Sequence, residues 1–383
     1  MQVVDYLIVG AGFSGVVLAE RLASQSGKRC LIVDRRSHIA GNAYDPIDSA
    51  GVRVHAYGPH YFRTNSDRVI DYLSQFTNWH PVDYKILSWV EGKFWPFPIN
   101  LNTYEKLVGH SATSDEMQAA LDKWKEPVEN PINSEEVIVS QVGWQLYEMF
   151  FKGYTQKQWK RDPRDLDTSV CGRIPVRTNR DDRYLRESFQ ALPRDGYTAL
   201  FQKMLDHPLI EVRLNTEYRE IQKSISYTHL IFTGPVDEYF DYCYGRLPYR
   251  SLRFEPESFS PDQLKAREGI SGKKGFWQPA MQVNYPNDHD FTRIVEVKHA
   301  TGQKCENTTI VREYPQDDGP KNEPYYPIPA SDAKSLYRQY RERAGAEKGV
   351  SFVGRLAAYR YYNMDQVVGM ALNEFDKLKS RGS

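Results

Sequence analysis

The first 34 residues constrain the fold of this chain more than any other segment. An apolar run, VVDYLIV, leads into a turn with three glycines, and a second apolar run, CLIVD, follows. The GxGxxG spacing between two such runs is typical of a strand, a tight turn, a helix and a second parallel strand. Gly10 makes the turn, Gly12 lets the backbone approach a pyrophosphate, and Gly15 lets the helix pack close to the first strand. We therefore predict an α/β unit that binds a dinucleotide.

The residues around this turn fit the same ligand. Phe13 and Ser14 open the predicted helix, whose N-terminal N–H groups attract phosphate. Asp34 ends the second strand, where a carboxylate accepts a hydrogen bond from a ribose hydroxyl, and Arg35 follows it. The alternative is a glycine-rich turn in an ordinary α/β unit.

Segments further along the chain favour FAD over NAD as the dinucleotide. Gly41 and Asn42 lie shortly beyond the second strand, an extension found in flavoproteins of the glutathione reductase type. Residues 228–235, THLIFTGP, predict a strand that ends in a glycine turn. FAD is therefore the expected cofactor.

The end of the chain supports the same cofactor. Residues 350–375 predict a strand, a turn with Gly354 and Arg355, and a closing helix. Met364 and Asp365 open that helix, and its positive end would face the flavin pyrimidine.

The middle of the chain predicts a helical insert followed by an antiparallel sheet. Three runs begin with capping-box spacing, which marks helix N-termini. The pairs are Asn102 with Glu105, Thr113 with Glu116, and Asn133 with Glu136. Residues 161–179 are polar and lack helical periodicity, which predicts a mobile lid loop. Short aromatic and β-branched runs over 241–316 predict the sheet.

One stripe of the insert is a candidate nucleobase wall. Phe151, Tyr154 and Gln158 fall at i, i+3 and i+7, which places two rings and an amide on one helix face. Rings and an amide suit a nucleobase, and packing in the core is the alternative.

Composition excludes several classes of function. The chain has 50 basic and 50 acidic residues, so it has no overall positive field to attract nucleic acid. No apolar stretch is long enough to span a membrane and no leader peptide is visible, so we expect a cytoplasmic protein. The four cysteines form no CxxC pair, and we expect no metal site.

Motifs along the whole chain resemble those of the bacterial UDP-galactopyranose mutases. They are YGPHYF (57–62), FPIN (97–100), LYEMFFKGYTQKQW (146–159), RIPVR (173–177), YGRLPYRSL (244–252), PYYPI (324–328) and FVGRLAAYRYYNMD (352–365). The resemblance implies an interrupted Rossmann-like FAD domain of the glutathione reductase type, an inserted helical bundle and a twisted antiparallel sheet. The implied ranges are 1–79, 190–240 and 340–383 for the FAD domain, 101–185 for the helical domain, and 80–100 with 241–339 for the sheet.

The resemblance also implies a reaction. Such enzymes are isomerases that interconvert UDP-galactopyranose and its furanose form, which supplies surface polysaccharide. Reduced FAD is the covalent catalyst in this family, because flavin N5 attacks the anomeric carbon as UDP leaves. The implied partners are a UDP-sugar, an electron donor such as NAD(P)H or a reductase, and further copies of the chain in a homodimer or larger assembly.

Residue roles carry over at the matching motif positions. Arg173 and Arg293 would clamp the diphosphate, since a guanidinium offers a planar fork of donors. The other implied substrate contacts are Phe151 and Tyr154 at the uracil, Trp159 near the sugar, Asn284 at the uracil, Tyr184, Tyr326 and Tyr361 at the diphosphate, and Asn363. His60 would lie at the edge of the flavin ring, and Asn363 would also contact the cofactor.

Two positions depart from the commonest family pattern. Arg63 stands where many members have histidine, and Asn363 stands where some have aspartate. Arg63 is longer than histidine and permanently charged, and it can donate to an acyl carbonyl. Members with arginine here include ones that accept the N-acetylated sugar, so we hypothesise that the chain accepts UDP-N-acetylgalactosamine beside UDP-galactose.

Three other functions stay open from the sequence. A mutase for another nucleotide sugar, such as dTDP-fucose or GDP-heptose, shares the chemistry. A flavin oxidoreductase of the amine oxidase type shares the FAD signals but needs no arginine clamp. Rab-escort and GDI proteins resemble this superfamily without using flavin.

Overall fold

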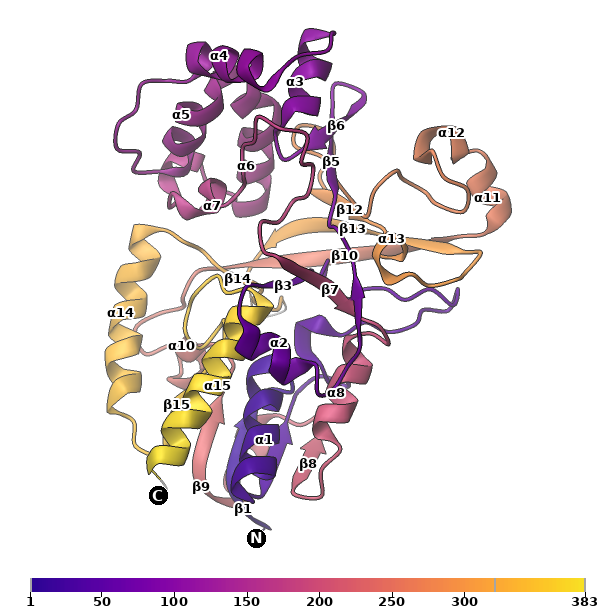
Figure 1. Cartoon of the computed structure of the whole chain (residues 1–383). Helices are drawn as coiled ribbons and strands as arrows, with labels where there is room; N and C mark the ends of the chain where they lie inside the picture. Colours follow the sequence, from indigo (N-terminus) through magenta and orange to yellow (C-terminus); the bar gives the residue numbers. More distant parts are fainter. Residues whose placement is uncertain (1, 320–321, 382–383) are drawn as a thin grey trace.

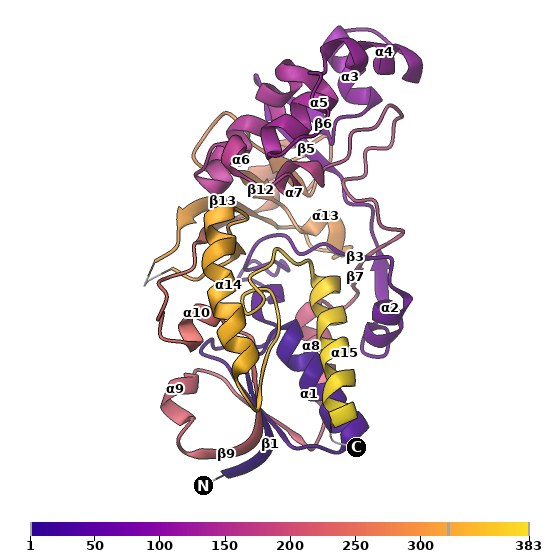
Figure 2. The same cartoon turned by 90° about the vertical axis from the view of Figure 1, so that its left-hand side faces the viewer.

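The computed structural model describes residues 2–319 and 322–381. Figure 1 shows a sheet flanked by helices at the bottom, a long sheet across the middle and a group of helices at the top. Both ends of the chain lie at the bottom in the two views (Figures 1 and 2). The chain therefore returns to its first sheet after building the other two parts.

The lower sheet has five parallel strands. Their order is β15 (Val350–Phe352), β9 (Ile225–Phe232), β1 (Gln2–Val9), β2 (Cys30–Val33) and β8 (Ile210–Arg213). All four residues of β2 are buried, as expected for a parallel strand covered on both faces. Helices α1 (Phe13–Ser26) and α15 (Met364–Arg381) lie side by side in both views, beside α8 (Tyr197–Leu205). The predicted α/β unit at the N-terminus is confirmed.

The middle sheet has seven strands. Their order is β14 (Tyr326–Pro327), β10 (Tyr249–Phe259), β13 (Thr308–Asp317), β12 (Arg293–Val295), β11 (Gln282–Asn284), β5 (Ile86–Val90) and β6 (Lys93–Phe97). Every pair is antiparallel except β11 with β5, which is parallel. A third, three-stranded sheet joins the two larger sheets, with order β3 (Phe62–Thr64), β7 (Phe189–Pro193) and β4 (Trp79–Pro81). The exact limits of the three domains stay a prediction.

The remaining helices connect or cover these sheets. They are α2 (Asp67–Leu73), α9 (Tyr218–Ile221), α10 (Val236–Tyr239), α11 (Pro261–Lys265), α12 (Glu268–Ser271), α13 (Lys298–Thr301) and α14 (Ser331–Ala346).

The group at the top of Figure 1 is the helical insert. It comprises α3 (Leu101–Val108), α4 (Ser114–Trp124), α5 (Ser134–Tyr147), a π-helical turn (Glu148–Lys152), α6 (Gly153–Trp159) and α7 (Ser169–Gly172). Thr113 and Glu116 form the predicted capping box of α4, and Asn133 caps α5. The predicted pair Asn102 and Glu105 is wrong, because Asn100 caps α3 and its box partner is Thr103. The physical reason is that Asn102 already lies inside the helix, where its side chain cannot reach the free N–H groups.

The π-helical turn follows a sharp bend in α5. Gly143 has φ of 76°, and a Cβ atom built there would lie 2.2 Å from the carbonyl oxygen of Trp124. The bend lets α5 pass close to the end of α4. The single turn of π-helix that follows leads into α6, which belongs to the site described below.

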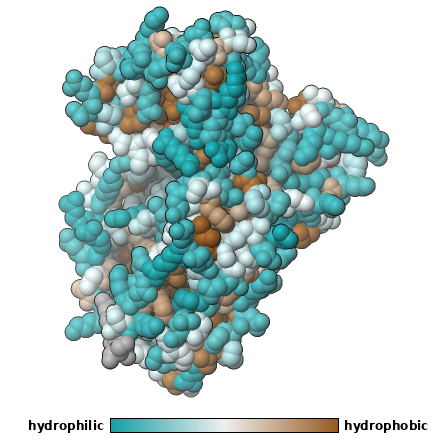
Figure 3. All heavy atoms as spheres, viewed as in Figure 1, coloured by the Kyte–Doolittle hydropathy of each residue, from teal (hydrophilic) through white to brown (hydrophobic). Residues whose placement is uncertain are grey.

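The face drawn in Figure 3 is mostly hydrophilic, with apolar side chains in separate patches. Within residues 2–319 and 322–381, every helix is too short or too polar to cross a membrane.

The bend at Gly143 generates a prediction. We expect Gly143→Ala to lower the unfolding free energy by about 1–3 kcal/mol or more, since Ala meets both an unfavourable φ and a backbone oxygen. Urea unfolding followed by circular dichroism measures the change. Gly345→Ala in α14 is the matched control, because its Cβ meets no atom within 4 Å. We expect this variant to be about 0.4–1 kcal/mol more stable. Equal stability of Gly143→Ala and the wild type would contradict the prediction.

Candidate active site

A cavity of about 460 Å³ lies at the carboxyl ends of the parallel strands. Most residues predicted to bind the dinucleotide line it, including the first two glycines of the turn. Those predicted residues are Gly10, Gly12, Phe13, Ser14, Asp34, Arg35, Gly41, Asn42, His60, Gly354, Arg355 and Met364. Ligands of open α/β sheets bind at this end of the strands, so the position and the lining agree.

The glycines of this cavity are required by close backbone approaches. A Cβ atom at Gly41 would lie 2.9 Å from Cα of Gly12, so the second loop passes directly over the turn. Gly15 lies outside the lining, and its Cβ would lie 2.0 Å from the carbonyl oxygen of Gly10. Gly15 therefore allows α1 to pack against the turn, as its spacing predicts. Asp34 accepts hydrogen bonds from the N–H groups of Ala11 (2.8 Å) and Arg36 (2.9 Å), which holds its carboxylate at the cavity wall.

Hydrogen bonds hold the backbone of His60 on both sides. Its N–H group donates to Nδ1 of His55 at 3.0 Å, and its carbonyl accepts from the hydroxyl of Tyr197 at 3.0 Å. The His60 ring lies with Nδ1 2.8 Å from the carbonyl of Gly58, and a carbonyl only accepts, so Nδ1 carries the proton. Burial lowers the pKa of both histidines to about 3, so both are neutral near pH 7. His55 is a residue that the sequence analysis missed.

A second cavity of about 420 Å³ shares His60, Arg355 and Met364 with the first. Four predicted arginines line it, which are Arg63, Arg173, Arg293 and Arg355. The Cζ atom of Arg173 lies 4.8 Å from the ring centre of Tyr361, and that of Arg355 lies 5.5 Å from it. Burial alone would raise the pKa of the Tyr361 hydroxyl, but Arg173, Arg355 and Arg293 outweigh it and lower the pKa. The cavity therefore has a strong positive potential, which suits an anion.

Two carboxylates that the sequence analysis missed accompany these arginines. Glu313 is fully buried and accepts from Nε of Arg293 at 2.9 Å, with a second contact at 2.8 Å to Nη2. Glu187 accepts from Nε of Arg63 at 3.0 Å. Glu313 lies in strand β13, where it is buried between the partly exposed Arg312 and Tyr314. These pairs fix the planes of two guanidinium groups and leave other N–H groups for a ligand.

A third, small cavity of about 60 Å³ adjoins the second and is lined in part by the helical insert. Phe151, Tyr154 and Gln158 line it together with Asn284, so the predicted stripe borders a cavity, although Phe151 also packs in the core. Gln158 is 7% exposed, and its Oε1 atom has no hydrogen-bond partner among residues 2–319 and 322–381. A buried acceptor without a donor is rare, so this oxygen is a candidate ligand contact.

The three cavities are neighbours, because each shares lining residues with the next. The second and third share the predicted residues Arg173, Tyr184, Arg293, Tyr326 and Tyr361. Trp159 lines only the third cavity, and Arg63 and Asn363 line only the second. Asp365, which was predicted to contact the cofactor, lines none of these three cavities. Its Oδ1 atom is buried and has no hydrogen-bond partner among the described residues.

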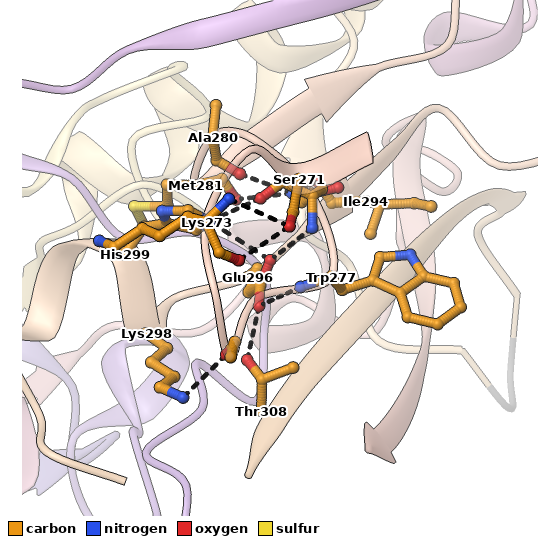
Figure 4. A network of polar contacts seen from close by, with 12 residues as sticks. Ser271, Lys273, Trp277, Ala280, Met281, Ile294, Glu296, Lys298, His299 and Thr308 are labelled. Carbon is orange, nitrogen blue, oxygen red and sulfur yellow. Dashed lines mark hydrogen bonds and ion pairs between the residues drawn. The ribbon is translucent and has the colours of Figure 1, made fainter. Parts of the chain in front are cut away.

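A buried carboxylate holds the strand that carries Arg293. Glu296 is fully buried and accepts from the N–H groups of Trp277 (3.0 Å) and Gln278 (3.0 Å) and from Oγ1 of Thr308 (2.6 Å) (Figure 4). The network ties the end of β12 to the segment before β11. It therefore fixes one end of the hairpin that presents Asn284 and Arg293.

Comparisons with known proteins show which proteins this chain is similar to. A family profile described as UDP-galactopyranose mutase matches residues 149–361, and one described as an NAD(P)-binding Rossmann-like domain matches residues 8–76. A probable UDP-galactopyranose mutase of Klebsiella pneumoniae is 37% identical over 380 residues, which cover 98% of this chain and 95% of that protein. A dTDP-fucopyranose mutase of Escherichia coli is 34% identical over 375 residues, 96% of each chain. A solved structure of reduced UDP-galactopyranose mutase superposes with a TM-score of 0.73 at 17% identity, covering 98% of this chain and 96% of that one.

The two buried histidines generate a prediction for stability against pH. The unfolded chain protonates both rings below about pH 6.5, whereas the folded chain keeps them neutral to a pKa of about 3. The unfolding free energy therefore falls as the pH falls from about 6.5, by about 1.4 kcal/mol per pH unit for each histidine. We expect His55→Asn, which cannot protonate, to remove one of these two contributions. Urea unfolding at about pH 7.5 and about pH 5 measures it, and an unchanged difference between the two pH values would contradict it.

Proposed function

The chain belongs to the UDP-galactopyranose mutase family, and on that premise we propose that it interconverts the pyranose and furanose forms of a UDP-linked hexose such as UDP-galactose. One observation carries the proposal. The dinucleotide cavity shares lining residues with an arginine-lined cavity, and that cavity shares lining residues with a small aromatic one. A cofactor, a sugar diphosphate and a nucleobase would follow one another in this order along the three cavities.

We propose FAD as the cofactor in the first cavity. Gly10, Gly12 and Ser14 line this cavity at the N-terminus of α1, where backbone N–H groups can bind a pyrophosphate, so the residues fit the group. FAD, when bound and reduced, supplies the nucleophile for the anomeric carbon. His60, Arg355 and Met364 line both the first and the second cavity, so they would border the flavin ring. An NAD(P)H or reductase donor is part of this proposal, because the reaction itself has no net redox change.

The arginines of the second cavity would hold the diphosphate. Arg173 and Arg293 approach it from different elements, the end of α7 and the start of β12. Cleavage of the glycosidic bond leaves charge on the departing phosphate, so these donors stabilise the transition state more than the substrate. Glu313 keeps Arg293 oriented, and the hydroxyls of Tyr184, Tyr326 and Tyr361 are further donors in this cavity.

The third cavity would bind the nucleobase. The unpartnered Oε1 atom of Gln158 suits the N3–H donor of uracil, and the rings of Phe151 and Tyr154 suit its faces. Thymine carries the same N3–H group, so this contact supports either base. The third cavity would therefore accept the base of a UDP-sugar or of a dTDP-sugar.

We also propose that Arg63 contacts the sugar and helps to select it. Its Nε atom is engaged by Glu187, while the guanidinium lines the second cavity. A guanidinium held in one plane by a carboxylate keeps its remaining donors aimed in a fixed direction, which suits an acyl carbonyl. This supports UDP-N-acetylgalactosamine as a substrate beside UDP-galactose.

An oxidase of the amine oxidase type is the weaker candidate. Its substrates are amines, which are cationic near neutral pH, and the positive second cavity opposes them. A flavin-free escort function is the other candidate, and it predicts a colourless purified protein.

The central prediction is that only the reduced protein turns over its substrate. We expect dithionite-reduced protein to form furanose product from UDP-galactose, and oxidised protein to form none. Chromatography of the nucleotide sugars measures it, with dTDP-fucose and GDP-heptose as further substrates. Failure with UDP-galactose and UDP-N-acetylgalactosamine would overturn the proposal, and product with dTDP-fucose alone would move it to that sugar. Turnover by oxidised protein would overturn the role of the reduced cofactor.

Arg63 has its own prediction. We expect Arg63→His to lower kcat/KM for UDP-N-acetylgalactosamine about tenfold relative to UDP-galactose, since one charge-assisted hydrogen bond is worth roughly that factor. Steady-state assays on the same reduced preparation measure both sugars. An unchanged ratio between the two sugars would overturn the role of Arg63.

A further inference from the structure

The ammonium group of Lys157 lies in a cage of backbone carbonyls. It donates to the carbonyls of Asp288 (3.0 Å), His289 (3.2 Å) and Phe291 (3.1 Å), and also to that of Tyr285. Lys157 comes from α6, whereas all four carbonyls belong to the loop between β11 and β12. One charged side chain therefore ties α6 to this loop, in addition to the apolar core that the helical insert shares with β5 and β6.

Two further contacts fix the same loop against the same helix face. The side-chain amide of Asn287 donates to the carbonyl of Met149 at 3.1 Å. A Cβ atom at Gly153 would lie 2.6 Å from the carbonyl oxygen of Pro286, so the loop backs directly onto the helix. Positions 149, 153 and 157 are spaced by four residues, which places all three contacts on one face.

The loop joins two residues of the proposed site. Asn284 precedes Tyr285, and Arg293 follows Phe291 by two residues. Carbonyls at both ends of the loop are thus held by Lys157, close to Asn284 on one side and Arg293 on the other. On the helix, Tyr154 and Gln158 line the third cavity beside Lys157.

We propose that Lys157 is a positioning residue, which fixes the distance between the nucleobase wall on α6 and the diphosphate arginine Arg293. The inference rests on the proposed nucleotide site and adds how its two halves are aligned. Without the ammonium, four carbonyl dipoles would point at one another in a partly buried space, so the loop would have to rearrange. Each half of the site would survive this change, but their spacing would not. Burial also lowers the pKa of Lys157 to about 8, although the nearby carboxylates of Asp288 and Asp290 act in the opposite direction and raise it.

The test compares the Kd of UDP with the Kd values of its two parts, uridine and pyrophosphate. Purified holoenzyme, in its oxidised form, is titrated with UDP, with uridine and with pyrophosphate. We expect Lys157→Met to raise the Kd of UDP about tenfold or more, because the two halves of the ligand no longer bind together. The Kd values of uridine and pyrophosphate should stay within about twofold of the wild type.

Matched variants separate alignment from general damage. Lys152 lies on the preceding turn and, among the described residues, pairs only with Glu148 at 3.3 Å. Lys152→Met should therefore bind all three ligands like the wild type. Lys157→Arg keeps the charge and the donors, so it should recover part of the UDP affinity even if Lys157→Met is poorly folded.

The outcomes are distinct. Unchanged UDP affinity in Lys157→Met, or an equal loss for UDP, uridine and pyrophosphate, would overturn the positioning role. The absence of recovery in Lys157→Arg would also count against it. A wild-type protein that binds no UDP would instead overturn the proposed function, and the inference with it.

Discussion

The pairing of β1 with β2 on one side and β9 on the other determines where the site can form. Parallel strands end at the same edge of a sheet, so the turns after β1, β9 and β15 meet there. The approach is close enough that a Cβ atom at Gly10 would lie 2.1 Å from Oγ1 of Thr233, and one at Gly354 would lie 2.6 Å from Oγ of Ser14. The first cavity is therefore bounded by segments that are more than 300 residues apart in the chain.

The second constraint is electrostatic. A protein with no net charge must attract an anion with local groups, and the second cavity does so with four predicted arginines from separate parts of the chain. Burying guanidinium groups without partners would be costly, so the structure gives Arg293 a buried carboxylate and stacks Arg173 and Arg355 on Tyr361. The same arrangement that makes these cations tolerable in the folded chain also holds them in fixed orientations for a ligand.

The helical insert and the long sheet share an apolar core, and polar contacts at the β11–β12 hairpin add to it. Glu296 holds the base of the β11–β12 hairpin and Lys157 holds its tip. Polar contacts of this kind have narrow geometry, whereas apolar packing tolerates small shifts. A site assembled from two domains needs that precision, because a small error in spacing would separate the nucleobase wall from the arginines.

The sequence by itself determined the dinucleotide turn, the α/β class, the helical insert, the sheet and the family, because each depends on local spacing or on colinear motifs. It also placed Phe151, Tyr154 and Gln158 on one helix stripe, although it left open whether that stripe faces a core or a cavity. Only the tertiary structure decided this. It also showed that Glu313 pairs with Arg293, Glu187 with Arg63, and the loop carbonyls with Lys157. The physical reason is that these contacts join residues 20 to more than 120 positions apart, and periodicity along the chain carries no information about which distant segment lies opposite.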